Sequence, residues 1–168
     1  MANILVLYDS RTGNTKKMTE FVFEGANASG KNVVKLLNVY ETTAKDIKWC
    51  DGIAVGSPTN MGLMSWKMKK FWDDSGKELW GKIDSKIGCA FSSEGGWGGG
   101  AEVTCMSILT VLLNYGFLVF GATDYVAEKF TLHYGATNPG EPDSQAAIDA
   151  CKRIGKKLDD WVDKYFNK

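Results

Sequence analysis

Short apolar runs alternate along this chain with longer segments of helical periodicity, and this alternation limits the folds that the chain can adopt. The runs that we expect to form strands are residues 3–8, 32–37, 52–56 and 86–92, with a fifth that begins at 117–120. They are apolar at almost every position, as in strands that are buried on both faces of a sheet. Apolar residues recur at three- and four-residue steps in segments 15–28, 64–71, 101–115 and 147–165. This spacing predicts amphipathic helices.

Strands that alternate with helices predict a parallel sheet that is covered on both faces. We therefore expect an α/β fold with a doubly wound five-stranded parallel sheet in the order 2-1-3-4-5. The 168 residues are enough for one domain, and no repeat or linker interrupts them, so we expect residues 1–168 to form a single domain. Segment 135–143 is rich in Gly and Pro and is expected to be a long loop. Asp143 or Ser144 should cap the last helix.

Composition argues against several classes of partner. The chain has 20 basic and 20 acidic residues, whereas proteins that bind nucleic acid present a basic surface. The longest apolar stretch, 108–119, is too short and too interrupted to span a bilayer. The first residues lack the charge of a signal peptide, so we expect no membrane partner and a cytoplasmic location. Metal or dithiol spacing is absent, which predicts reduced, mostly buried thiols at Cys50, Cys89, Cys105 and Cys151.

In a doubly wound sheet, ligands bind beyond the carboxyl ends of the strands, where the strand order reverses. The loops after the first, third and fourth strands should therefore form the site. The first loop is polar and leads into a helix: Ser10, Arg11, Thr12, Gly13, Asn14 and Thr15. Free N–H groups at a helix N-terminus suit a phosphate, and the lack of a Walker lysine favours a static anchor. A helix cap rich in Ser and Thr is the alternative.

The other two loops combine turn residues with groups that suit a planar heterocycle. After the third strand come Pro58, Thr59, Asn60, Met61 and Gly62. Their polar groups would bond the edge of a ring and Met61 would lie against its face, the alternative being a plain Pro-Gly turn. After the fourth strand come Ser92, Ser93, Glu94, Gly95, Gly96, Trp97 and Gly98. Ordering so many glycines is costly without a ligand, so we expect their N–H groups to face a ring that Trp97 stacks on or walls; a flexible surface loop is the alternative.

With these three loops in view, the chain resembles the flavodoxins over almost its full length. Segment 10–15 looks like the FMN-phosphate loop of that family. Segments 57–62 and 93–100 are most similar to one branch, the tryptophan-repressor-binding-protein type of NAD(P)H:quinone oxidoreductases. The resemblance implies noncovalently bound FMN, no assigned catalytic residue, and electron transport between redox partner proteins, ferredoxin-linked or similar.

The resemblance leaves alternative functions. Short connections at 37–52 and after Tyr125, where the quinone reductases have insertions, favour an electron carrier, as a monomer or a homodimer. The glycine-rich third loop, together with Trp80, His133 and Tyr134, favours an FMN-dependent NAD(P)H:quinone oxidoreductase, whose partners would be NAD(P)H and a quinone. A sensor or scaffold that binds FMN is a third interpretation. In a carrier, Glu94 beside the pyrimidine end of FMN would lower the flavin's reduction potential.

Overall fold

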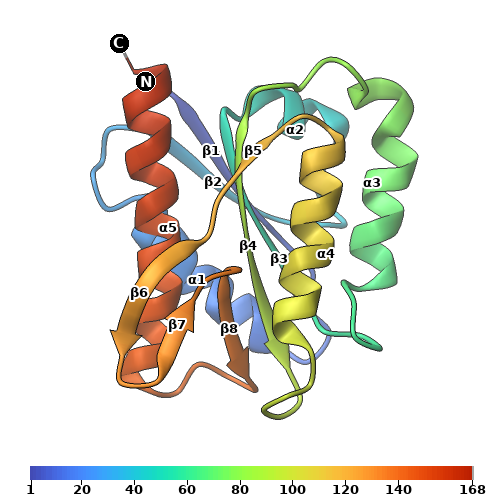
Figure 1. The fold of residues 1–168 in the computed structure, drawn as a ribbon. Helices are drawn as coiled ribbons and strands as arrows, with labels where there is room; N and C mark the ends of the chain where they lie inside the picture. Colours follow the sequence, from blue (N-terminus) through green and yellow to red (C-terminus); the bar gives the residue numbers. More distant parts are fainter. Residues whose placement is uncertain (168) are drawn as a thin grey trace.

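The computed structural model describes residues 1–167, with the side chain of residue 124 outside the description. Its main sheet is parallel and runs in the order β2-β1-β3-β4-β5, as predicted (Figure 1). The strands are β2 (Val33–Asn38), β1 (Asn3–Tyr8), β3 (Gly52–Pro58), β4 (Ile87–Glu94) and β5 (Leu118–Val119). The predicted doubly wound α/β class is therefore confirmed.

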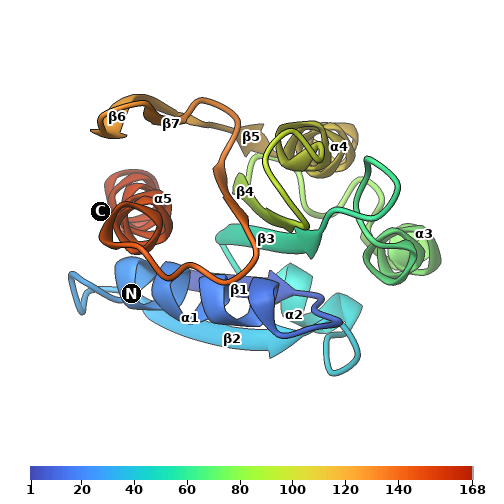
Figure 2. The same ribbon diagram turned by 90° about the horizontal axis from the view of Figure 1, so that it is seen from below.

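Helices cover both faces of the sheet, as the view from below shows (Figure 2). One face carries α1 (Asn14–Ala26) and α5 (Gln145–Phe166), and the other carries α2 (Ala44–Trp49), α3 (Trp66–Leu79) and α4 (Ala101–Asn114). Side chains of β1 alternate between the two resulting cores: Val6 packs with α1 and α5, and Leu7 packs with the other three helices. This double burial explains why the strand is apolar at successive positions.

The fifth sheet position is divided between two strands, which the sequence did not indicate. β5 pairs with Ile87 and Gly88 at the start of β4, whereas β8 (Ala136–Pro139) pairs with the end of β4, from Phe91 to Glu94. An antiparallel hairpin of β6 (Ala122–Ala127) and β7 (Phe130–Leu132) is inserted between them. The prediction of a loop over 135–143 is therefore wrong at 136–139.

Gly135 explains how the chain re-enters the sheet. Its φ of 137° is in the region that favours glycine, and a Cβ there would overlap the carbonyl group of Ala90. The backbone can therefore approach β4 closely enough for the next four residues to pair with it. The apolar periodicity of a strand is absent from these four residues, and the Gly and Pro residues around them favoured the prediction of a loop.

α2 is a second element that was not predicted. The helix has six residues, too few for a clear apolar period. It begins with a capping box in which the N–H of Thr43 donates to Asp46 Oδ2 over 2.9 Å. At the last helix, the predicted cap is Ser144, whose Oγ accepts from the N–H of Ala147 over 3.2 Å.

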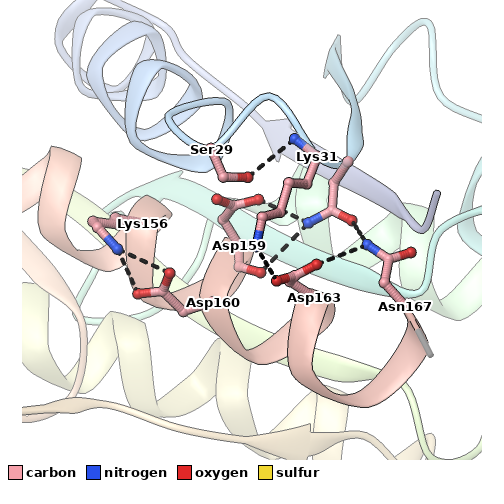
Figure 3. A network of polar contacts seen from close by, with 8 residues as sticks. Ser29, Lys31, Lys156, Asp159, Asp160, Asp163 and Asn167 are labelled. Atoms are coloured by element: carbon pink, nitrogen blue, oxygen red, sulfur yellow. Dashed lines mark hydrogen bonds and ion pairs between the residues drawn. The ribbon is translucent and has the colours of Figure 1, made fainter.

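A polar network ties the C-terminal half of α5 to the segment before β2 (Figure 3). Asn32 Nδ2 donates to Asp159 Oδ1 over 2.8 Å, and Asn167 Nδ2 donates to Asn32 Oδ1 over 2.7 Å. Lys31 pairs with Asp163 over 2.9 Å, and this hydrogen-bonded contact lowers the pKa of the Asp163 carboxyl. The network closes the amino edge of the sheet, opposite the three predicted site loops.

None of the helices in residues 1–167 is long and apolar enough to cross a membrane. The four cysteines are free and buried.

Candidate cofactor site

The three predicted loops meet at the carboxyl edge of the sheet, the lower edge in Figure 1. The parallel register places Ser57 beside Ser92 and Pro58 beside Ser93, so β3 and β4 end together. The loops are also bonded to one another. Thr15 Oγ1 lies 2.8 Å from Ser93 Oγ, and the N–H of Thr59 donates to the carbonyl of Ser93 over 2.7 Å. Ser93 therefore links the other two loops.

The first loop ends at Gly13, a left-handed residue with φ of 100° that caps the start of α1. Within the described chain, no side chain caps the first turn of this helix, so the positive end of its dipole is open to a ligand. Ser10 Oγ accepts from the N–H of Gly13 over 3.2 Å and holds the loop in shape. Arg11 and Thr12 are exposed beside it, Asn14 is half-buried and Thr15 is buried. This geometry suits a phosphate anchor.

Asp9, which precedes the loop, was not singled out from the sequence. Its side chain is 2% exposed, and its Oδ1 has no hydrogen-bond partner in the described part of the chain. The pKa of Lys67 is raised, chiefly by a hydrogen bond with Tyr40 and further by the charge of Asp9. A buried acidic side chain thus lies under the first loop, and Lys67 lies beside it. A lone Asp after an apolar strand gives no sequence signal for this arrangement.

The second loop is a tight hairpin turn. Asn60 and Leu63 exchange both backbone hydrogen bonds, at 2.8 and 3.1 Å. Met61 and Gly62 between them have φ of 49° and 81°, as in a two-residue hairpin loop. The side chain of Met61 is fully exposed at the tip of the turn.

The third loop is anchored at both ends. Glu94 at the end of β4 is 5% exposed, and its Oε2 accepts from the N–H of Ala101 over 2.9 Å, at the start of α4. Within the loop, the N–H of Gly99 donates to the carbonyl of Gly96 over 3.0 Å. The ring of Trp97 is 72% exposed and meets Phe130 of β7 edge-on, with ring centroids 6.3 Å apart. Phe130 was not predicted from the sequence, because the hairpin that carries it was not predicted.

The loops leave room beside their glycines. A Cβ at Gly95, Gly96 or Gly98 would meet no atom of the described chain within 4 Å, and the same holds at Gly13 and Gly62. These glycines therefore line open space and are not needed to avoid contacts inside the protein. Backbone N–H groups around that space can reach a flat ligand without steric interference from side chains.

Two further residues were considered for the site. Trp80 follows the C-terminal end of α3, at the edge of the sheet opposite the loops, where its ring lies 5.9 Å from that of Tyr115. It cannot contact the site of its own chain. His133 is exposed after β7. In the described residues, no group of three or more His, Cys, Asp and Glu side chains is placed to hold a metal ion.

The fold and the three loops define a class of protein: a doubly wound α/β protein in which the loop after β1 suits a phosphate and the loops after β3 and β4 flank space that suits a flat ligand. The family model described as "Flavodoxin" matches residues 6–131, and the chain belongs to the flavodoxin family.

Individual relatives agree with this assignment. A flavodoxin from Aquifex aeolicus is 63% identical over 162 residues, which cover 96% of this chain and 88% of that protein. An NAD(P)H dehydrogenase (quinone) from Gluconacetobacter diazotrophicus is 32% identical over 94% of this chain and 93% of that protein. This confirms the predicted relation to the quinone-reductase branch. The solved structure of a flavodoxin from the domain Archaea has a TM-score of 0.72 and 27% identity, covering 95% of this chain and 98% of that one.

FMN is the cofactor of this family, and its members pass electrons to redox partner proteins. The residues at the carboxyl edge fit this cofactor. The open start of α1 suits the phosphate, and the space beside the glycines of the second and third loops suits a flat ring.

Proposed function

We propose that this protein carries electrons on FMN bound noncovalently at the carboxyl edge of the sheet, between redox partner proteins. The single observation that carries the proposal is the meeting of an uncapped helix N-terminus with two anchored loops that flank open space. The 63% identity to a flavodoxin supports it. FMN supplies redox chemistry that no side chain offers, and the protein supplies binding, orientation and electrostatics.

In this proposal the first loop holds the phosphate. The N–H groups of Asn14 and Thr15 point along the axis of α1, and the hydroxyls of Ser10 and Thr12 add neutral donors. Arg11 adds a charge that is always present. Together these groups can bind a phosphate without the lysine that phosphoryl transfer would use.

The second and third loops hold the ring between them. Backbone N–H groups of the segments 61–62 and 95–98 supply donors for its polar edge, because the glycines of these loops leave the backbone uncovered. Trp97, held edge-on by Phe130, provides an aromatic wall. Met61 at the tip of its turn is free to cover the other side of the ring.

A second candidate function is FMN-dependent NAD(P)H:quinone oxidoreduction. The observation that favours it is the similarity to an NAD(P)H dehydrogenase (quinone) over 94% of this chain. Stopped-flow mixing with NADPH, and then with a quinone, separates the two. A carrier will oxidise NADPH slowly by itself and will accept electrons quickly from a reduced ferredoxin. Fast NADPH oxidation with quinone turnover would favour the reductase.

The remaining features of the proposal concern the whole chain. Residues 1–168 are proposed to act as one domain, as a monomer or a homodimer, with ferredoxin-linked proteins as partners. Four free and buried thiols support a reducing compartment such as the cytoplasm.

Apoprotein titrated with FMN and with riboflavin tests the site directly. Thr12→Ala removes one hydroxyl from the phosphate loop, so FMN should bind more weakly by about 1–3 kcal/mol, the usual value for a hydrogen bond to a charged group. Riboflavin has no phosphate, so its affinity should not change. Fluorescence quenching of the flavin measures both affinities.

Thr110→Ala is the matched control, because Thr110 is exposed on the outer side of α4 and bonds only its own helix, at the carbonyl of Met106. It should alter neither affinity. Wild-type protein that takes up no FMN would refute the proposal. Equal losses of FMN and riboflavin affinity in Thr12→Ala would mean that the phosphate binds elsewhere.

A further inference from the structure

A chain of hydroxyl groups lies beneath the second and third loops. Thr104 Oγ1 of α4 donates to Thr59 Oγ1 over 3.0 Å, and Thr59 Oγ1 lies 3.1 Å from Ser92 Oγ. Ser92 Oγ in turn donates to the carbonyl of Ser57 over 2.8 Å. Thr104 and Ser92 are fully buried. This row of hydroxyl groups runs from α4 through the second loop to β4 and β3.

The direction of these hydrogen bonds follows from counting protons. A hydroxyl has one proton to donate and two lone pairs that accept. Ser92 uses its proton on the carbonyl of Ser57, so it must accept from Thr59. Thr59 therefore has no proton left for a ligand and accepts from Thr104. Bonds ordered in one direction strengthen one another, and they fix the rotamer of each hydroxyl.

The far side of the same loop is also held to α4. The N–H of Met64 donates to Ser107 Oγ over 3.3 Å, and Ser107 Oγ donates to the carbonyl of Thr104 over 2.7 Å. The N–H of Ser65 donates to Ser57 Oγ over 2.8 Å. The hairpin turn at 60–63 is thus held on both sides, at Thr59 and at Met64, by the first two turns of one helix.

The start of α4 also fixes the third loop, through the bond between its first N–H, at Ala101, and Glu94. The two loops come close there: a Cβ at Gly100 would lie 3.6 Å from Cα of Gly62 and 3.8 Å from Cγ2 of Thr59. One helix end therefore sets the separation of the two loops. A ring bound between them needs a fixed separation if both are to contact it.

We propose that Thr104 is a positioning residue for the flavin ring: it sets the separation of the second and third loops through Thr59, without touching the cofactor. This rests on the proposed function, because it needs the ring to bind between these two loops. Thr59 and Ser92 then belong to the support of the site, and contacts to the ring from this side come from the backbone of 61–62.

The test uses Thr104→Val, which keeps the shape of the side chain and removes the donor, and Thr104→Ser, which restores the donor. Thr110→Val on the outer side of the same helix is the control. Apoprotein of each variant is titrated with FMN and with riboflavin, and the two midpoint potentials of the bound flavin are measured.

Thr104→Val should weaken both flavins by the same factor, about two- to tenfold for one net hydrogen bond. It should also move at least one midpoint potential, and Thr104→Ser should return these values toward wild type. Equal factors for the two flavins separate an effect on the ring site from an effect on the phosphate anchor. If the Val variant fails to fold, Thr104→Ala serves the same comparison.

A Thr104→Val protein with a lower Tm but with wild-type affinities and potentials would overturn the proposal, because the hydroxyl would then serve stability alone. Loss of FMN affinity with unchanged riboflavin affinity would overturn it as well. Wild-type protein that binds neither flavin would refute the proposed function itself, and the role of Thr104 with it.

Discussion

Glu94 is a buried carboxylate whose Oε2 accepts from the first N–H of α4 over 2.9 Å. The bond places this acceptor oxygen at the positive end of the helix dipole and fixes the point where the glycine loop ends. An electrostatic effect of Glu94 on the flavin was expected from its place in the third loop, and the structure adds this structural role. One carboxylate can perform both, because only one of its oxygens is needed for the helix.

Glu94→Gln separates the two roles. The amide oxygen of Gln can still accept from Ala101, while the negative charge is lost. Both midpoint potentials of bound FMN should rise, on the order of tens of millivolts, because electrons are then added without a nearby anion. A potentiometric titration of the holoprotein measures the change.

Glu102→Gln is the control for Glu94→Gln. Glu102 follows Ala101 in the first turn of α4, and its side chain is exposed. Glu102→Gln should shift the potentials less, because solvent screens an exposed charge. Identical potentials in Glu94→Gln and wild type would show that the charge of Glu94 does not reach the flavin.

The sequence predicted which loops meet at the candidate site, but not the hydrogen bonds that their side chains make. The three loops were recognisable from their composition and from their places after strands. The hydrogen bonds of Thr59 and Ser92, by contrast, depend on the register of β3 against β4 and on the placement of α4. Thr104 gave no signal, because a Thr inside an apolar helix is most simply a buried helix residue. Such roles follow from tertiary contacts.

At the scale of elements, α1 and α5 pack with their backbones in close contact. A Cβ at Gly155 of α5 would overlap the carbonyl of Val22, and one at Gly25 of α1 would overlap the carbonyl of Lys152. Each helix thus presents a glycine to the backbone of the other. The two helices cover one face of the sheet, so their separation decides how well that core is filled.

Gly155→Ala should force these helices apart and lower the free energy of unfolding by about 1–3 kcal/mol, the usual cost of overpacking a core. Gly76→Ala is the control in the last turn of α3, where the nearest atom to a Cβ would be Tyr115 Oη at 3.5 Å. That change should be neutral or stabilising, because Ala favours helix over Gly by up to about 1 kcal/mol. Urea unfolding curves give both values; equal midpoints for the two variants would contradict the close packing.

Elements with a strong pattern were predicted well and short ones were not. The first strand was predicted at 3–8, as observed, and the helix at 101–115 ends one residue earlier. The fifth strand position was harder, because β5 has two residues and β8 has four, with a hairpin between them. Neither is long enough to show a period, and their place in the sheet depends on pairing with β4.

At the scale of the whole molecule, the thiols are distributed over both cores. Cys151 and Cys89 lie in the core beneath α1 and α5, and Cys50 and Cys105 lie in the core on the other face. Burial raises the pKa of all four thiols, to about 12 for Cys50 and Cys151. The native state therefore keeps these thiols protonated, whereas an unfolded chain ionises them near pH 8.5.

This difference fixes the sign of an alkaline effect on stability. A pKa that is raised on folding contributes stability that is fully present below the unfolded pKa and is lost as the pH rises toward the folded value. Between pH 9 and 10, each thiol that ionises only in the unfolded chain should lower the free energy of unfolding by about 1.4 kcal/mol per pH unit. Cys151→Ala should reduce that slope by the contribution of one thiol, even though the cavity that it leaves lowers stability at every pH.

Urea unfolding across this pH range measures the slope, with thiol labelling of the native protein at pH 8 as a second measurement. Rapid labelling of the native thiols, or equal slopes in the variant and wild type, would contradict the burial that underlies this argument.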